Sequence, residues 1–191
     1  MKPILFNTAM VRAILDGEKT CTRRIIKKEI PGGYKPLGFV LYPTDDKELG
    51  NLVFGGKGAN VYYAKPPYKV GDILYVRETW ANTWTPDGDI GFVYKADGEP
   101  KNFPYWGNAK QGKHEVWMPS IHMPKEAARI FLKVTSVRAE RLKDITDEGC
   151  LSEGIREFTK DGIVKKYWDG WTNLFEYNPW VWVIEFEKVE K

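Results

Sequence analysis

The segment WVWVIEFEKVE, at residues 180–190, constrains the fold most, because its side chains alternate with a period of two. One face would hold Trp180, Trp182, Ile184 and Phe186, and the opposite face Val181, Val183, Glu185 and Glu187. Such a pattern is typical of a β-strand that covers a core and pairs with neighbouring strands. The chain is therefore expected to build β-sheet.

The same period recurs at residues 73–79, at residues 130–138 and in the run GFVYKAD. In the first of these, the expected faces are Leu74, Val76 and Glu78 on one side and Ile73, Tyr75 and Arg77 on the other. Short helices are expected at residues 8–16 and 146–153, where Thr or Asn can cap the start and Gly the end. Most connections are too short for βαβ crossovers. This predicts an α+β fold, mostly β, as a small barrel with flanking short helices.

A chain of 191 residues fits one domain, expected to span residues 1–191. Two stretches interrupt the pattern, at about residues 27–68 and 156–178, and are interpreted as insertions into that domain. In the first insertion, the runs GFVLY and ANVYYA are expected to form the strands of a hairpin.

Charge and cysteine content narrow the classes of function. The net charge of +3 is too small to establish a nucleic-acid partner, and nothing indicates a membrane partner. We expect neither a signal peptide nor a membrane span, since no apolar run approaches about 20 residues, and two cysteines fit a reduced, cytoplasmic compartment. No metal-ligand spacing and no cofactor motif is found, so neither a metal nor a cofactor is expected.

The segment GEKTCTRR, residues 17–24, is the first candidate for chemistry. Alternation along a strand would place Thr20, Thr22 and Arg24 on one face, with Lys19 at its mouth. A neutral Lys amine can draw a proton from a Thr hydroxyl if burial or nearby positive charge lowers its pKa. The alternative is a solvated Lys in a turn, followed by Thr residues that simply favour strands.

Further candidates are charged side chains. The basic run of Arg23, Arg24, Lys27 and Lys28 can contact phosphates, or can be the solvated side of a strand. Glu78 and Glu153 are the candidate acids or bases. Glu153 lies in the last turn of the expected late helix, where a carboxylate opposes the helix dipole.

Four motifs in this order resemble the ASCH-domain family, relatives of the PUA-like β-barrels that bind RNA. The motifs are Gly17–Arg24, Val70–Trp80, Ile145–Thr146 with Glu153–Ile155, and Val181–Phe186. The segment Trp117–Pro124 resembles the longer form common in phage and prophage genomes. The resemblance covers most of the chain apart from the two insertions. It implies a PUA-like barrel with a polar cleft between the first helix, the first strand and the late helix.

The resemblance also implies an activity, because small bacterial members include an amidohydrolase that deacylates N4-acetylcytidine. Its functional Lys, Thr and Glu match Lys19, Thr22 and Glu153, which would activate the nucleophile and shuttle a proton. The residues expected to contact a nucleoside or nucleic acid, RNA in preference to DNA, are Thr20, Arg23, Arg24, Tyr75, Arg77, Glu78 and Trp80. The alternatives are a non-catalytic RNA- or DNA-binding module and a phage accessory domain that binds another protein.

Overall fold

The structure is a computed structural model that describes residues 1–43, 45–58, 60–84, 90–98, 117–155 and 172–190. Strand residues outnumber helical ones, so the predicted α+β, mostly β fold class is confirmed. The chain divides into two compact units. The first unit comprises Met1–Lys19, Ile73–Lys133 and Lys188–Lys191, and the second comprises Thr20–Asp72 and Val134–Glu187. A single domain over residues 1–191 stays a prediction.

In the first unit, a short parallel strand pair lies beside a helix. Strand β1 (Lys2–Leu5) pairs in parallel with β6 (Ile73–Arg77), and β6 pairs antiparallel with the first residues of β9 (Phe131–Arg141). Helix α1 (Thr8–Leu15) begins where the Asn7 side chain accepts a hydrogen bond from the Met10 amide. Gly17, with a φ of 76°, takes the left-handed conformation that follows the helix end. The predicted helix is confirmed, whereas β1 was not predicted.

The rest of the first unit is a hairpin over an apolar cluster. Strands β7 (Trp80–Trp84) and β8 (Ile90–Tyr94) pair antiparallel. Trp80 packs with Met123 and Phe131 in this cluster, and its ring lies 5.7 Å from that of Phe92.

The described 3₁₀ turns of the chain are Asp46–Glu48, Lys95–Asp97, Ser120–His122, Lys125–Ala127 and Leu142–Asp144.

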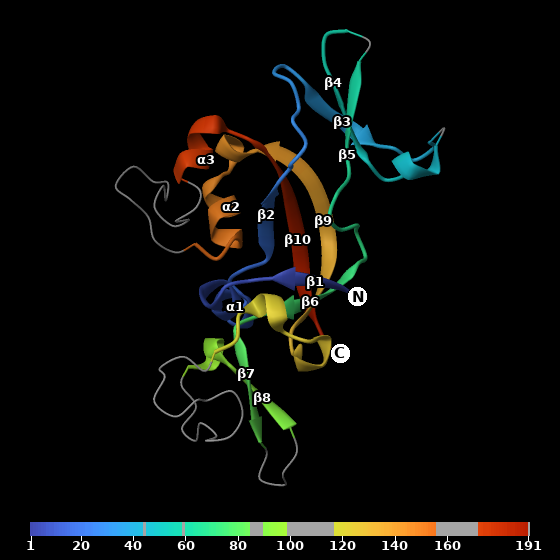
Figure 1. The fold of residues 1–191 in the computed structure, drawn as a ribbon. Coiled ribbons are helices and arrows are strands. Elements are labelled where there is room, and N and C mark those ends of the chain that lie inside the picture. The colour runs from blue at the N-terminus through green and yellow to red at the C-terminus, as the bar shows by residue number, and fades with distance from the viewer. Residues whose placement is uncertain (44, 59, 85–89, 99–116, 156–171, 191) are drawn as a thin grey trace. The chain divides into compact units, whose positions relative to one another are not determined.

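In the second unit, three neighbouring strands support a short helix (Figure 1). Strand β10 (Trp180–Val189) lies between β9 and the edge strand β2 (Cys21–Ile25), with which it pairs antiparallel. Helix α2 (Asp147–Ser152) contacts β2, and Thr146 caps its first turn, as predicted. Helix α3 (Thr172–Tyr177) precedes β10. Val181 and Val183 of β10 are buried in one apolar cluster with Leu142.

The first predicted insertion builds a separate antiparallel sheet in the second unit. Its order is β3 (Lys35–Phe39), β4 (Leu52–Gly55) and β5 (Val61–Ala64). The expected hairpin between GFVLY and ANVYYA is wrong, because β4 lies between the two runs and pairs with both. The pattern missed β4, whose Leu52 and Phe54 are buried. Phe54 packs edge-on against the Trp180 ring, at 5.1 Å between centroids.

The barrel and the second insertion stay predictions. No closed barrel is found among the described strands. Most of the insertion at 156–178 lies outside the described residues, which resume at residue 172 with α3. Within the described parts of the chain, no helix is long and apolar enough to cross a membrane.

Candidate functional site

Strand β2 separates its side chains onto two faces, as its alternation predicts. Thr22 lies opposite Ile184 of β10, and Arg24 lies opposite Trp182. Directly opposed residues of an antiparallel pair share a face, so Thr22 and Arg24 lie on the same side as Trp182. Arg23, opposite Val183, lies on the other side. The predicted common face of Thr22 and Arg24 is confirmed.

Thr22 carries an unusual buried hydroxyl. The residue is 0% exposed, and its Oγ1 has no hydrogen-bond partner among the described residues. A buried polar atom that makes no hydrogen bond costs about 1–3 kcal/mol of stability. Thr20, just before β2, is exposed, and its backbone bonds to Ser152 and Phe186 instead. Thr22 is therefore the more notable of the two candidate Thr residues.

On the other face of β2, Arg23 links two carboxylates. Its Nε donates to Glu140 Oε1 at 2.7 Å, and its Nη1 donates to Glu153 Oε1 at 3.3 Å. Nη1 also donates to the Gly149 carbonyl at 3.2 Å. Burial lowers the pKa of the Arg23 guanidinium, but Cys21, Glu140 and Glu153 raise it further, so the net shift is upward. Arg23 therefore stays charged and holds Glu153 in place.

Helix α2 brings Glu153 to this position. Thr146 Oγ1 accepts from the Gly149 amide at 3.0 Å and caps the helix, while Glu153 stands at its C-terminal cap. Gly149 faces Arg23 so closely that an added Cβ would lie 2.8 Å from Nη2. Glycine at this position therefore leaves the space that the guanidinium occupies.

Lys19 is buried, not solvated in a turn. It is 2% exposed and belongs to the first unit, where its ammonium lies 5.5 Å from the centroid of the Phe6 ring. Its amide donates to the Ala13 carbonyl at 2.9 Å, just after α1. Thr22 and Glu153 belong to the second unit. Each of the three residues of the resemblance is thus a buried polar side chain, which is uncommon for Lys and Glu.

A hollow in the second unit opens beside the end of β2 and has a volume of about 570 Å³. Its cations are Arg24, Lys27, Lys28 and Lys65. Its rings are Tyr63, Tyr68 and Trp182, and the remaining lining is Ile25, Ile26, Ala64 and Pro67. We call this space the basic hollow. Sequence reasoning found Arg24, Lys27 and Lys28 but missed Lys65, Tyr68 and Trp182 as site residues, since only the folded chain brings them to β2.

Arg24 and Tyr68 influence each other in this hollow. Burial lowers the pKa of Arg24 by more than Tyr68 and Glu153 raise it. Burial also raises the pKa of the Tyr68 hydroxyl, which Arg24 partly counteracts. The Tyr68 phenol is therefore neutral at physiological pH, and the Arg24 side chain is partly desolvated.

The predicted contact residues of the first unit all take part in packing. Buried Glu78 accepts from Arg129 at 2.9 and 3.1 Å, and Arg129 also bonds Asp97 at 2.7 Å. Arg77 Nε donates to the Met123 carbonyl at 2.9 Å.

Two aromatic residues of the same predicted group belong to the apolar cluster of the first unit. Trp80 is buried in that cluster, and Tyr75 packs against it. The structure therefore assigns structural contacts to Tyr75, Arg77, Glu78 and Trp80, and their binding role stays a prediction.

Neither a metal site nor a similar known protein helps to identify the function of this site. Within the described ranges, no group of three or more His, Cys, Asp or Glu side chains is arranged to hold a metal ion. Comparison with protein-family models, curated proteins and solved structures finds no match to this chain.

Proposed function

We propose that the protein binds a nucleic-acid base or nucleoside in the basic hollow beside β2. One observation carries this proposal: polar and aromatic side chains from β2, β10 and the segment after β5 line one space of about 570 Å³. Small-molecule sites commonly measure about 300–1,000 Å³. The volume of this space lies within that range, which supports the proposal.

Aromatic rings supply affinity for a base without depending on its identity. Every base has a π-face, and stacking on an aromatic side chain contributes about 1–3 kcal/mol. Tyr68 is half-buried and can offer its ring, whereas Trp182 is buried and forms part of the wall. Arg24 can add hydrogen bonds to a base edge. RNA is the proposed form in preference to DNA, in line with the resemblance to PUA-like RNA-binding barrels.

Binding to nucleosides and oligonucleotides tests this proposal. We expect isothermal titration to detect cytidine or adenosine, and a single-stranded RNA hexamer to bind more tightly than the DNA hexamer of the same sequence. Arg24→Gln should weaken these interactions, while Arg138→Gln, an exposed Arg elsewhere in the second unit, should not. If no nucleoside and no hexamer binds at low salt, the proposal is wrong.

The second candidate function is hydrolysis of the amide of an N4-acylated cytidine. The observation that favours it is that Lys19, Thr22 and Glu153 are all buried polar side chains, although Thr22 and Arg23, the partner of Glu153, point to opposite faces of β2. In this proposal, the resemblance implies the roles: Lys19 and Thr22 would serve the attack on the amide carbonyl, and Glu153 would carry the proton to the departing amine. The family membership implied by the motifs is part of the same proposal.

Release of cytidine from N4-acetylcytidine tests the second candidate. Wild type should turn over the substrate, and Lys19→Ala and Glu153→Gln should each lose activity. Thr135→Val is a suitable control, because Thr135 is exposed on β9. If wild type is no faster than Lys19→Ala, hydrolysis of this substrate is excluded. A third candidate, a phage accessory protein that binds another protein, has no specific observation in its favour.

A further inference from the structure

The basic hollow has a charge imbalance that a neutral nucleoside does not explain. Arg24, Lys27, Lys28 and Lys65 line it, and no carboxylate is found among its described lining residues. The chain as a whole is nearly balanced, with 29 basic and 26 acidic residues. The local excess of positive charge is thus a property of this surface.

A second polar hollow in the same unit provides a comparison. It measures about 260 Å³, and both of its arginines, Arg23 and Arg138, are within salt-bridge distance of Glu140. Arg138 also pairs with Glu185. There the protein neutralises its own cations. In the basic hollow, four cations and no carboxylate are among the described lining residues, so negative charge would be attracted there.

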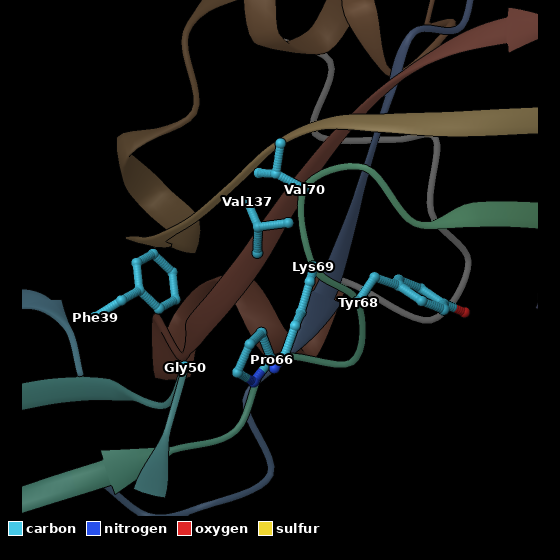
Figure 2. A pocket seen from close by; sticks show the side chains of 7 residues that line it. All are labelled: Phe39, Gly50, Pro66, Tyr68, Lys69, Val70 and Val137. Carbon is cyan, nitrogen blue, oxygen red and sulfur yellow. The ribbon is translucent and has the colours of Figure 1, made fainter. Parts of the chain in front are cut away.

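The aromatic lining of the hollow comes from three places: Tyr63 from β5, Tyr68 from the segment after β5, and Trp182 from β10. Pro66 and Lys69 line a neighbouring pocket of about 190 Å³, whose other lining includes Phe39, Val70 and Val137. Figure 2 shows the Tyr68 ring pointing away from Phe39, Pro66 and Val137. Tyr68 lines both this pocket and the basic hollow, and it is half-buried.

We propose that the basic hollow takes a nucleotide, with its phosphate on Lys27, Lys28 and Lys65 and its base against Tyr68. This inference rests on the proposed base-binding function and adds the phosphate to it. Lysine ammonium groups bind phosphate oxygens as point charges, and Arg can bind them in a bidentate manner. The ligand is either a free nucleotide or one unit of a single strand.

Titration calorimetry with cytidine, cytidine 5′-monophosphate and inorganic phosphate tests this inference. We expect the nucleotide to bind roughly tenfold or more tightly than cytidine at low salt, because its phosphate adds charge-assisted hydrogen bonds to the lysines. Replacing Lys27, Lys28 and Lys65 together by Gln should remove that preference, so that cytidine and its monophosphate bind with similar affinity. All three are exposed, so folding should be retained.

The matched control replaces Lys47, Lys125 and Lys188 by Gln, which are equally exposed and change the net charge by the same amount. It should keep the preference for the nucleotide. A single-stranded hexamer without terminal phosphates separates the two sources of phosphate. Tighter binding of the hexamer identifies a strand as the ligand, and tighter binding of the monophosphate identifies a free nucleotide.

Three results would overturn the inference. Equal affinity for cytidine and its monophosphate would exclude phosphate recognition and leave base binding intact. Inorganic phosphate that binds as tightly as the monophosphate would exclude a contribution of the base. If cytidine, the monophosphate and the hexamer all fail to bind, the proposed function fails together with the inference.

Discussion

Arg23 and Glu153 are joined inside the second unit by a hydrogen bond of 3.3 Å between Nη1 and Oε1, and both side chains are nearly fully buried. Glu140 orients the guanidinium from its other side at 2.7 Å. A buried pair adds little stability over apolar residues, but removal of one partner leaves a buried charge. The buried carboxylate of Glu153 is therefore stabilised by the guanidinium of Arg23.

The first prediction follows from this dependence. Arg23→Met should lower the free energy of unfolding by about 3–5 kcal/mol, because Glu153 keeps its charge in the interior without the guanidinium. The double variant Arg23→Met with Glu153→Gln should recover part of that loss. Urea denaturation measures both. Arg138→Met, which removes an exposed guanidinium from its pairs with Glu140 and Glu185, should cost no more than about 1 kcal/mol. Equal losses for Arg23→Met and Arg138→Met would contradict a buried role for Arg23.

The second prediction concerns the pH dependence of stability through Glu78. Burial raises the pKa of this carboxyl above its ordinary value of 4.5, although Arg129 lowers it in part. In the folded state Glu78 therefore holds its proton to higher pH than in the unfolded state. Its contribution to stability is fully present below about pH 4.5 and falls as the pH rises through the raised pKa.

The comparison is between wild type and Glu78→Gln, measured by urea denaturation across a pH series. The difference in unfolding free energy, wild type minus variant, should become smaller as the pH increases above 4.5. Glu126→Gln is the matched control, because Glu126 is exposed in the same unit. A difference that grows with pH would show that the pKa of Glu78 is lowered instead.

Thr22 provides the third prediction, in which stability and activity change in opposite directions. Thr22→Val keeps the shape of the side chain and removes a buried hydroxyl that has no hydrogen-bond partner among the described residues. Stability should rise by about 1 kcal/mol or more, since the desolvation cost of that hydroxyl is relieved. Hydrolysis of N4-acetylcytidine should be lost if Thr22 carries the proposed role.

Thermal denaturation and the cytidine-release assay measure the two effects. Thr135→Val, at an exposed position of β9, should change the unfolding free energy by no more than about 0.5 kcal/mol. A Thr22→Val protein with lower stability than wild type would mean that the hydroxyl makes a stabilising bond after all.

Local signals in the sequence were sufficient to predict elements whose cause is local. Asn7 and Gly17 bound α1, and Thr146 caps α2, because capping depends on neighbouring backbone groups. Alternation also predicted that Leu74 and Val76 of β6 share a face with Glu78, which follows the strand, and all three are buried. These features follow from the chain's own period and caps.

Elements that depend on distant partners were not predictable in this way. Strand β1 is four residues long and is specified by its parallel partner β6. Strand β4 is held by β3 and β5 on either side. The same limit applies to the site: alternation placed Thr22 and Arg24 on one face, but Tyr68 and Trp182 reach Arg24 only through tertiary structure. The spacing of these residues along the sequence does not indicate that they lie together.

The fourth prediction tests whether Tyr68 is a stacking surface. Tyr68→Leu keeps an apolar side chain but removes the ring, so the affinity for a single-stranded RNA hexamer should fall roughly tenfold, within the 1–3 kcal/mol that stacking contributes per base. Tyr42→Leu is the matched control, since Tyr42 is 94% exposed and does not line the basic hollow.

Fluorescence anisotropy of a labelled hexamer, measured at several salt concentrations, distinguishes the contribution of the Tyr68 ring from that of the lysines. Loss of a ring should shift the binding curves by the same factor at every concentration, whereas loss of lysine contacts should reduce the salt dependence itself. If Tyr68→Leu binds the hexamer as tightly as wild type does, the Tyr68 ring does not contribute to binding.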